Sequence, residues 1–352
     1  MMSENQTVSL QDYKDRTHLK VLIIAGLGVV LLFMVLVAIS VGQYGLSLGE
    51  VVHYILHKDD STESIIIWRW RMPIAVGTVV VGATLALAGT VMQCILKNPL
   101  ASPYTLGLSS AAAFGASLGI LATENIIDLD SFGPYVVTLF AFMWSMLATG
   151  FIILMAKYTS LSPEAMVLAG VAITSIFSAS VSALQYFATD SVLASIIYWQ
   201  FGDVTKLDWT KILFITIVLV ICTIYFMNKR WDYNALDAGD ETARCLGVDI
   251  NATRVIGMVA ASVVTSVAVS FIGVIGFVGL LGPHITRKIL GSDHRFLIPG
   301  SMIVGALILL TSCIIAQNAF SFVMPVGIIT SFLGGPLFLI ILLKSYRKKE
   351  AL

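Results

Sequence analysis

Few residues in this sequence combine the types and spacing that catalysis or metal binding requires. No CxxC spacing links its cysteines, which are Cys94, Cys222, Cys245 and Cys313. The histidines fall almost entirely in loops, and they are His18, His53, His57, His284 and His294. No HExxH or GxxxxGKS/T pattern occurs, so neither a zinc-hydrolase helix nor a P-loop is present. We expect no catalytic, metal or cofactor site in this chain, and free thiols that are mostly buried. An intramembrane enzyme is a remote alternative.

A polar stretch in the middle of the chain is the exception, because nearly everything around it is apolar. Residues 234–254 read "NALDAGDETARCLGVDINATR". We expect Asp240 to cap a short helix over 241–246, and Gly247 to end it in the left-handed conformation. Asn234 is expected to begin a shorter helix, with Gly239 as the hinge. These helices offer a partner protein one apolar face, made of Ala235, Leu236, Ala243, Leu246 and Val248.

Composition places these residues in a membrane protein. The 352 residues are 57% hydrophobic and 12% charged, with a mean hydropathy of +0.91, whereas soluble domains carry about 25% charged residues. The formal net charge is zero, which argues against nucleic acid as a partner. The sequence therefore predicts an all-α, polytopic membrane protein in the cell membrane.

Apolar runs predict ten membrane-spanning helices. Their approximate limits are 21–42, 74–96, 104–122, 135–156, 164–187, 210–227, 254–272, 275–290, 298–317 and 326–343. The run over 21–41 is too long for a signal peptide, so it is read as a retained span. We divide the chain into a cytoplasmic segment (1–20), a ten-span domain (21–345, with a polar connection at 228–253) and a basic tail (346–352).

Basic residues orient these spans. With both termini in the cytoplasm, sixteen Lys and Arg lie inside and five outside, as the positive-inside rule requires. The spans themselves hold little charge beyond His284 beside Pro283, which we expect to be a loop or helix-end residue. A secondary transporter usually needs ionisable residues there, so it is the weaker alternative. Without a P-loop, ATP would have to be bound by another chain.

Two segments interrupt hydrophobic hairpins with backbone that cannot be regular helix. One covers 96–110 and contains Pro99 and Pro103; the other covers 270–288 and contains Gly273, Gly276, Gly279, Gly282 and Pro283. They fall in the two halves of the chain, one on the cytoplasmic side and one near the outer side. Such pairs indicate an inverted repeat around a central pathway.

The chain resembles the FecCD/BtuC-type permease subunits of ABC importers for iron siderophores, haem and cobalamin. Three motifs carry the resemblance: "GATLALAGTVMQCILKNPLASPYTLGLSSAA" (82–112), "GVIGFVGLLGPHITRKILGSDHRFLIPGSMIVGA" (273–306) and "PVGIITSFLGGPLFLIILL" (325–343). The resemblance implies a BtuC-like fold, a second permease chain (a copy or a paralogue), two cytoplasmic ATP-binding subunits that hold ATP-Mg, and an external solute-binding protein. The implied substrate is a metal chelate, first a ferric siderophore, with haem, cobalamin and molybdate open.

The resemblance also implies roles for particular residues. The ATPase is expected to dock at the polar stretch, at Asp240, Glu241, Ala243, Arg244, Leu246, Gly247 and Val248. The binding protein is expected to dock at Arg71, which matches the first arginine of the family's RxPR pattern; the second falls on Ile74, and Arg69 is its substitute here. The pathway and helix breaks are expected at Met92, Gln93, Asn98, Pro99, Pro103, Gly107, Gly273, Gly276, Phe277, Gly279, Pro283 and His284.

Overall fold

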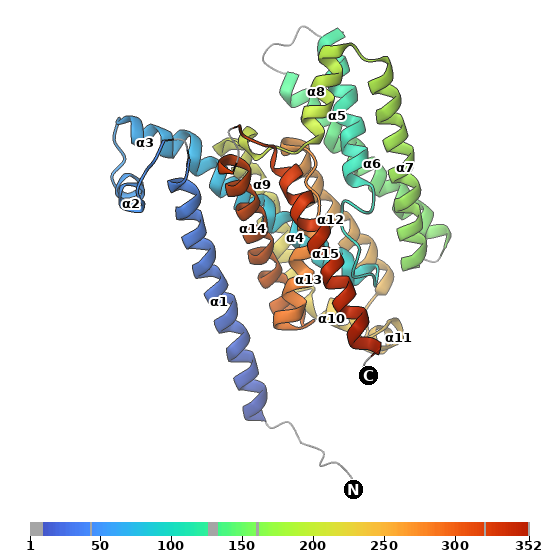
Figure 1. The fold of residues 1–352 in the computed structure, drawn as a ribbon. Coiled ribbons are helices and arrows are strands. Elements are labelled where there is room, and N and C mark those ends of the chain that lie inside the picture. Colours follow the sequence, from blue (N-terminus) through green and yellow to red (C-terminus); the bar gives the residue numbers. More distant parts are fainter. Residues whose placement is uncertain (1–9, 43, 126–132, 160–161, 320–321, 351–352) are drawn as a thin grey trace.

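The computed structural model describes residues 10–42, 44–125, 133–159, 162–319 and 322–350. Within these ranges every regular element is a helix, which confirms the all-α prediction (Figure 1). The first half holds α1 (Leu10–Ser40), α2 (Leu48–Leu56), α3 (Thr62–Ile66), the π-helical turn η1 (Ile67–Arg71), α4 (Met72–Ile95), α5 (Leu108–Asn125), α6 (Gly133–Tyr158) and α7 (Pro163–Phe187). The second half holds α8 (Asp190–Gln200), the 3-10 turn η2 (Val204–Lys206), α9 (Trp209–Asn228), α10 (Arg230–Asp237), α11 (Asp240–Cys245), α12 (Ile250–Ile272), α13 (Val278–Leu290), α14 (His294–Asn318) and α15 (Val326–Glu350).

Seven helical stretches of the described chain are long and apolar enough to cross a membrane. They are Lys14–Ser40, Thr62–Ile95, Gly133–Tyr158, Pro163–Phe187, Trp209–Asn228, Ile250–Ile272 and His294–Asn318. The other three expected spans correspond to α5, α13 and α15, which fall outside this set. The chain is thus a multi-pass membrane protein, and the number of ten spans stays a prediction. Helix α1 already begins at Leu10 and α15 continues to Glu350, so both predicted terminal segments are partly helical.

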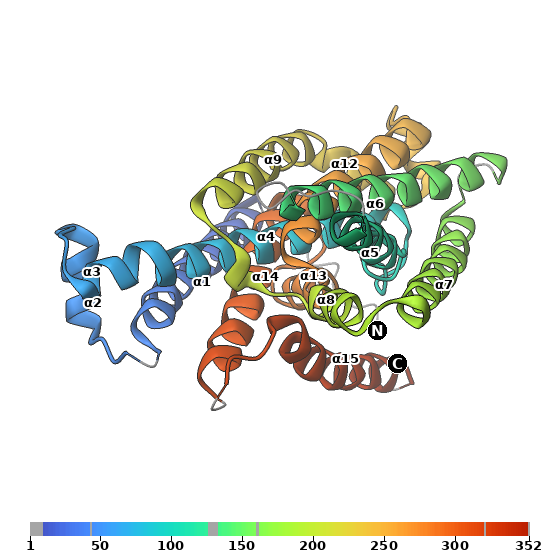
Figure 2. The ribbon, with the colours of Figure 1, turned by 90° about the horizontal axis from the view of Figure 1, so that it is seen from above.

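Helix α4 lies at the centre of the bundle (Figure 2). It is buried along nearly its whole length and packs against α9, α12, α13 and α14. Glycines permit this packing, since a Cβ on Gly82 would collide with the backbone of Gly305 in α14, and a Cβ on Gly89 with that of Gly279 in α13. Small residues at these crossings let membrane helices approach to backbone contact.

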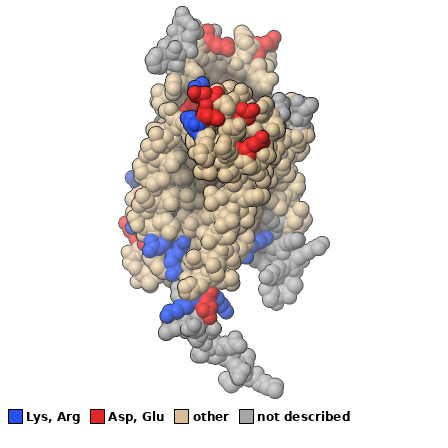
Figure 3. All heavy atoms as spheres, turned by 90° about the vertical axis from the view of Figure 1, so that its left-hand side faces the viewer, with Lys and Arg blue, Asp and Glu red and all other residues tan. Residues whose placement is uncertain are grey.

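The remaining helices surround this centre. Helix α5 packs against α6, α7 and α8, and α1 runs along α14 at the edge of the bundle (Figure 1). Figure 3 shows the face on which α1 lies, with acidic side chains concentrated toward one end and basic side chains prominent toward the other. By the positive-inside rule the basic end would be the cytoplasmic one, and this orientation stays a prediction.

Candidate functional site

The polar stretch folds as two short helices joined at Gly239, whose φ is +117°. Helix α10 begins at Arg230 rather than Asn234, so the expected start was wrong. Helix α11 begins at Asp240 itself with Gly239 in the capping position, so the expected Asp240 cap was also wrong. The predicted end at Gly247 is confirmed. Its φ is +81°, and the N–H groups of Gly247 and Val248 donate to the carbonyls of Arg244 and Ala243, which is the Schellman pattern.

The Asp240 carboxylate joins three segments instead of capping a helix. It accepts from Lys97 Nζ at 2.7 Å, and both of its oxygens accept from Arg254 Nη2 at 2.9 Å. Desolvation acts to raise the pKa of Asp240, but the hydrogen bonds from Lys97 and Arg254 outweigh it and lower that pKa. These three residues, which we call the Asp240 cluster, connect α11 to the segment after α4 and to the N-terminal part of α12.

Asn234 fastens α10 to the start of α14. Its amide nitrogen donates to Asp293 Oδ1 at 3.1 Å, and its oxygen accepts the backbone N–H of His294 at 2.8 Å. Asp293 caps α14 and pairs with Arg295 at 2.6 Å. Desolvation opposes ionisation of Asp293, yet the hydrogen bonds from Arg295 and Asn234 bring its pKa down to about 2. The polar stretch is therefore held by the bundle at both of its helices.

The single apolar face expected on these helices was wrong. Ala235, Leu236 and Ala243 are buried in the core of this chain, whereas the Leu246 side chain is 68% exposed. The surface left for a partner is the outer side of α11 and its end. We call it the α11 tip, and it consists of Glu241, Thr242, Arg244, Cys245, Leu246 and Gly247, all exposed.

The two arginines expected to dock a binding protein have different surroundings. Arg71 Nη1 donates to the carbonyls of Ile39 and Ser40 at 2.8 and 2.9 Å, and Nη2 donates to the carbonyl of Tyr44. Arg71 thereby satisfies the last carbonyls of α1, as basic side chains at helix C-termini commonly do. Arg69 is exposed and has no hydrogen-bond or ion-pair partner among the described residues. Arg69 is thus the more accessible of the two, and both docking roles stay predictions.

The two predicted helix breaks are real, but they are shorter than expected. The first lies between α4 and α5 and ends at Gly107, with φ +81°; it includes Asn98, Pro99 and Pro103. The second covers 273–277, where Gly273 and Phe277 have φ of +83° and +66°. Pro283 was wrongly expected to interrupt the chain, because it lies inside α13 together with Gly279 and His284. Pro103, in the first break, approaches Gly279 in the first turn of α13, just after the second break.

Most of the residues expected to line a pathway are buried within this chain. Met92 and Gln93 are 0% and 3% exposed. Gln93 Nε2 donates to the Leu280 carbonyl at 3.3 Å, and Gln93 Oε1 accepts from Arg287 Nη1 at 3.1 Å. These side chains therefore hold α13 against α4, and the glycines nearby serve close packing.

A polar cavity of about 300 Å³ between α5, α7 and α8 was not foreseen from the sequence. It is lined by Tyr104, Ser109, Ser110, Ala113, Ser178, Val181, Ser182, Gln185, Gln200 and Val274. On α7, the polar residues Ser175, Ser178, Ser182 and Gln185 recur at helical spacing, and the three serines are exposed. That spacing was the available signal, because it aligns polar groups along one face of an apolar helix.

Comparison with known proteins identifies the family to which this chain belongs. The profile of the FecCD transport family matches residues 30–344. This chain belongs to the FecCD family. A solved structure described as a metal-chelate type ABC transporter in an inward-facing conformation superposes on this FecCD permease with a TM-score of 0.80 and 29% identity, covering 92% of this chain and 99% of that one.

Named relatives of this FecCD permease differ in substrate. An ABC transporter permease of Methanocaldococcus jannaschii is 45% identical, covering 96% of this chain and 99% of its own. The hemin permease of Yersinia pestis is 33% identical (92% and 97% covered) and the vitamin B12 permease of Klebsiella pneumoniae is 34% identical (91% and 93% covered). The chain is therefore a permease subunit of an ABC importer in a cell membrane; the family component is not itself an enzyme, and such subunits work with ATPase and binding-protein partners.

Proposed function

We propose that this permease imports a ferric siderophore through a cavity between two permease chains. An external solute-binding protein delivers the chelate near Arg69, and two ATP-binding subunits, which hold ATP-Mg, dock at the α11 tips. Both termini lie in the cytoplasm. Cobalamin, haem or molybdate would be carried by the same machinery.

The polar face of α7 carries this proposal. Helix α7 is long and apolar enough to span the membrane, yet Ser175, Ser178 and Ser182 are exposed on it. Polar groups within a membrane face a protein interior or a water-filled cavity rather than lipid. A second permease chain opposite this face would enclose such a cavity.

The polar cavity between α5, α7 and α8 would form part of the wall of this pathway, and its lining supports a chelate as the substrate. No residue that lines it carries a formal charge, and its polar groups are hydroxyls and amides. Such groups hydrogen-bond a bulky complex weakly, so that the complex can leave as well as enter. The likeness to a metal-chelate type transporter supports the same substrate class.

Contacts of α11 support ATP-driven coupling. The α11 tip projects from the end of the bundle, while Asp240 at the start of the same helix bonds to Lys97 and Arg254. A displacement of α11 by the ATPase would therefore pull on the break after α4 and on α12. Those two segments adjoin the cavity-forming helices through α5 and the 273–277 break.

Co-purification tests the proposal. The tagged chain is solubilised gently from native membranes, and its partners are identified by mass spectrometry. We expect the wild type to retain an ATP-binding subunit, and a Leu246→Asp, Gly247→Pro double variant to lose it. Leu48→Asp is the matched control, because Leu48 is 43% exposed on α2, far from the α11 tip. Equal retention by the double variant and wild type would refute docking at this tip.

Uptake measurements then decide the substrate. The assembled importer with its binding protein is reconstituted in proteoliposomes, with ATP and the ATP-binding subunits on the side of the α11 tip. Ferric siderophore, haem, cobalamin and molybdate are each offered outside. ATP-dependent accumulation of the ferric siderophore alone is expected; accumulation of another substrate instead would reassign it.

A further inference from the structure

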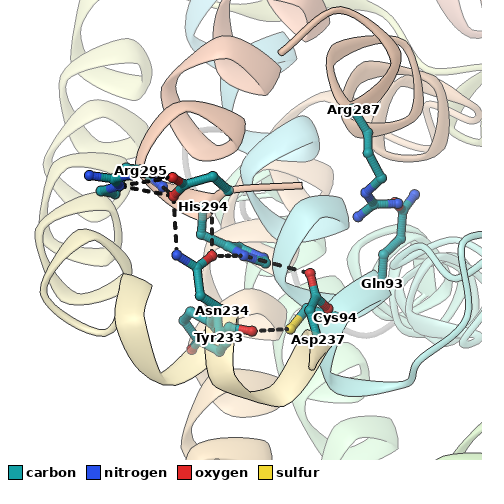
Figure 4. Close-up of polar contacts among 9 residues, drawn as sticks. Gln93, Cys94, Tyr233, Asn234, Asp237, Arg287, His294 and Arg295 are labelled. Carbon is teal, nitrogen blue, oxygen red and sulfur yellow. Dashed lines mark hydrogen bonds and ion pairs between the residues drawn. The ribbon is translucent and has the colours of Figure 1, made fainter. Parts of the chain in front are cut away.

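Three side chains of types that can bind a metal ion come together where α10 packs against α4 and α14 (Figure 4). Cys94 comes from the last turn of α4, Asp237 from the end of α10, and His294 from the first residue of α14. One ligand atom from each of these residues lies within 4.8 Å of the others. Cys94 and His294 are buried, and the Asp237 side chain is 29% exposed. Three elements that are distant in the sequence thus contribute a thiol, a carboxylate and an imidazole to one place.

Asn234 fixes the proton on the His294 ring. The backbone N–H of His294 donates to the side-chain amide of Asn234 at 2.8 Å. The accepting atom must therefore be the amide oxygen and not the amide nitrogen. The same oxygen lies 3.0 Å from His294 Nδ1, so Nδ1 must be the protonated ring nitrogen that donates to it. The lone pair of the ring is then on Nε2, which is buried and has no hydrogen-bond partner among the described residues. A metal-bound histidine usually donates its other ring N–H to an oxygen acceptor, and the Asn234 amide oxygen can serve as that acceptor here.

We propose that Cys94, Asp237 and His294 bind one divalent cation of the borderline class, such as Zn²⁺, Fe²⁺ or Co²⁺. Thiolate and imidazole ligands favour these ions over Mg²⁺ and Ca²⁺. The Cys94 thiol, which donates to the Tyr233 carbonyl at 3.4 Å, releases its proton to solvent when its sulfur binds the cation. One thiolate and one carboxylate cancel the two charges of the ion, so the buried complex is neutral.

Only a small closure would complete the site. Ligands of a tetrahedral zinc ion, bound at about 2.0–2.3 Å, lie roughly 3.5 Å apart. In the structure the three ligand atoms lie within 4.8 Å of one another. Asp237 is the most exposed of the three, and it leaves room for water as a fourth ligand. Because Asp237 ends α10, the bound ion ties that helix to both α4 and α14.

Cobalt binding tests this proposal on the purified full-length chain, after treatment with a chelator. The Cys245→Ser background is used, since Cys245 is the exposed free cysteine among the described residues. We expect one equivalent of Co²⁺ to produce a near-ultraviolet thiolate charge-transfer band that Zn²⁺ abolishes. Cys94→Ser should remove the band, and the matched control Cys222→Ser, at another buried thiol, should keep it.

A second variant separates binding from folding. Asn234→Ala removes the support of the ring and leaves all three ligands, so it should retain the band but weaken Co²⁺ binding by about 10–100-fold. Circular dichroism and gel filtration establish that each variant is folded. Hydrogen exchange should slow in α10 when Zn²⁺ is added. A folded chain that shows no thiolate band, or a band that persists in Cys94→Ser, would overturn the proposal, and neither result bears on ATPase docking at the α11 tip.

Discussion

Replacing Asp240 by alanine should separate fastening of α11 from docking of the ATPase. The change removes the Asp240 carboxylate from Arg254, which is 4% exposed. Breaking a fully buried ion pair costs about 3–5 kcal/mol. Asp240 is 32% exposed, so water offsets part of this cost, and we expect about 2 kcal/mol of destabilisation. Lys97 is 39% exposed, and its removal should cost at most about 1 kcal/mol.

Melting temperatures of the purified chain test whether Asp240→Ala is more destabilising than Lys97→Ala. Domains of about 150–250 residues lose about 2–4 °C per kcal/mol, and longer chains lose less. We therefore expect a fall of at most about 4 °C for Asp240→Ala and a smaller one, at most about 2 °C, for Lys97→Ala. Asp240→Asn keeps the shape of the side chain without its charge, so its melting temperature should lie between those of wild type and Asp240→Ala.

Transport provides the second measurement. The α11 tip is intact in Asp240→Ala, so the ATP-binding subunit should still co-purify, while uptake per ATP hydrolysed should drop. Equal melting of Asp240→Ala and Lys97→Ala, or unchanged uptake in a variant that has lost the ion pairs, would refute the view that this cluster transmits the motion of α11.

Other contacts give three further predictions. The pKa of Asp293 is lowered from 3.8 to about 2. The ionised carboxylate therefore stabilises the fold by about 2 kcal/mol above about pH 4, and this contribution is lost as the pH falls toward 2. The difference in melting temperature between wild type and Asp293→Asn should shrink over that pH range. Gly89→Ala places a methyl group against the α13 backbone and should cost at least about 1–3 kcal/mol, measured as lost folded yield, whereas Gly150→Ala meets nothing within 4 Å and should be tolerated. Arg69→Glu should weaken binding of the solute-binding protein in a salt-dependent manner without changing melting, whereas Arg71→Ala should lower the melting temperature, since the last carbonyls of α1 lose their donor; the opposite pattern would restore Arg71 as the docking residue.

The features that could be predicted from the sequence depend on the local chemistry of neighbouring residues. The low fraction of charged residues and the long apolar runs determined a multi-pass helical membrane protein, because the bilayer requires such runs. Gly247 determined the end of α11, since glycine adopts a left-handed φ without strain. The prolines and glycines near Pro103 and Gly273 marked the two helix breaks. Each of these properties depends on residues that are close in the sequence.

Packing between distant segments decided the rest. The sequence placed Asp240 at a helix start, but only the arrangement of α4, α11 and α12 brought Lys97 and Arg254 to its carboxylate. Helical spacing grouped the apolar residues of the polar stretch on one face, yet the bundle buries Ala243 and leaves Leu246 exposed. Arg71 matched a docking pattern, and the end of α1 engaged it instead. Cys94, Asp237 and His294 likewise meet only in the folded chain, because contacts between helices depend on which faces pack together, and the periodicity of one helix does not specify its neighbour.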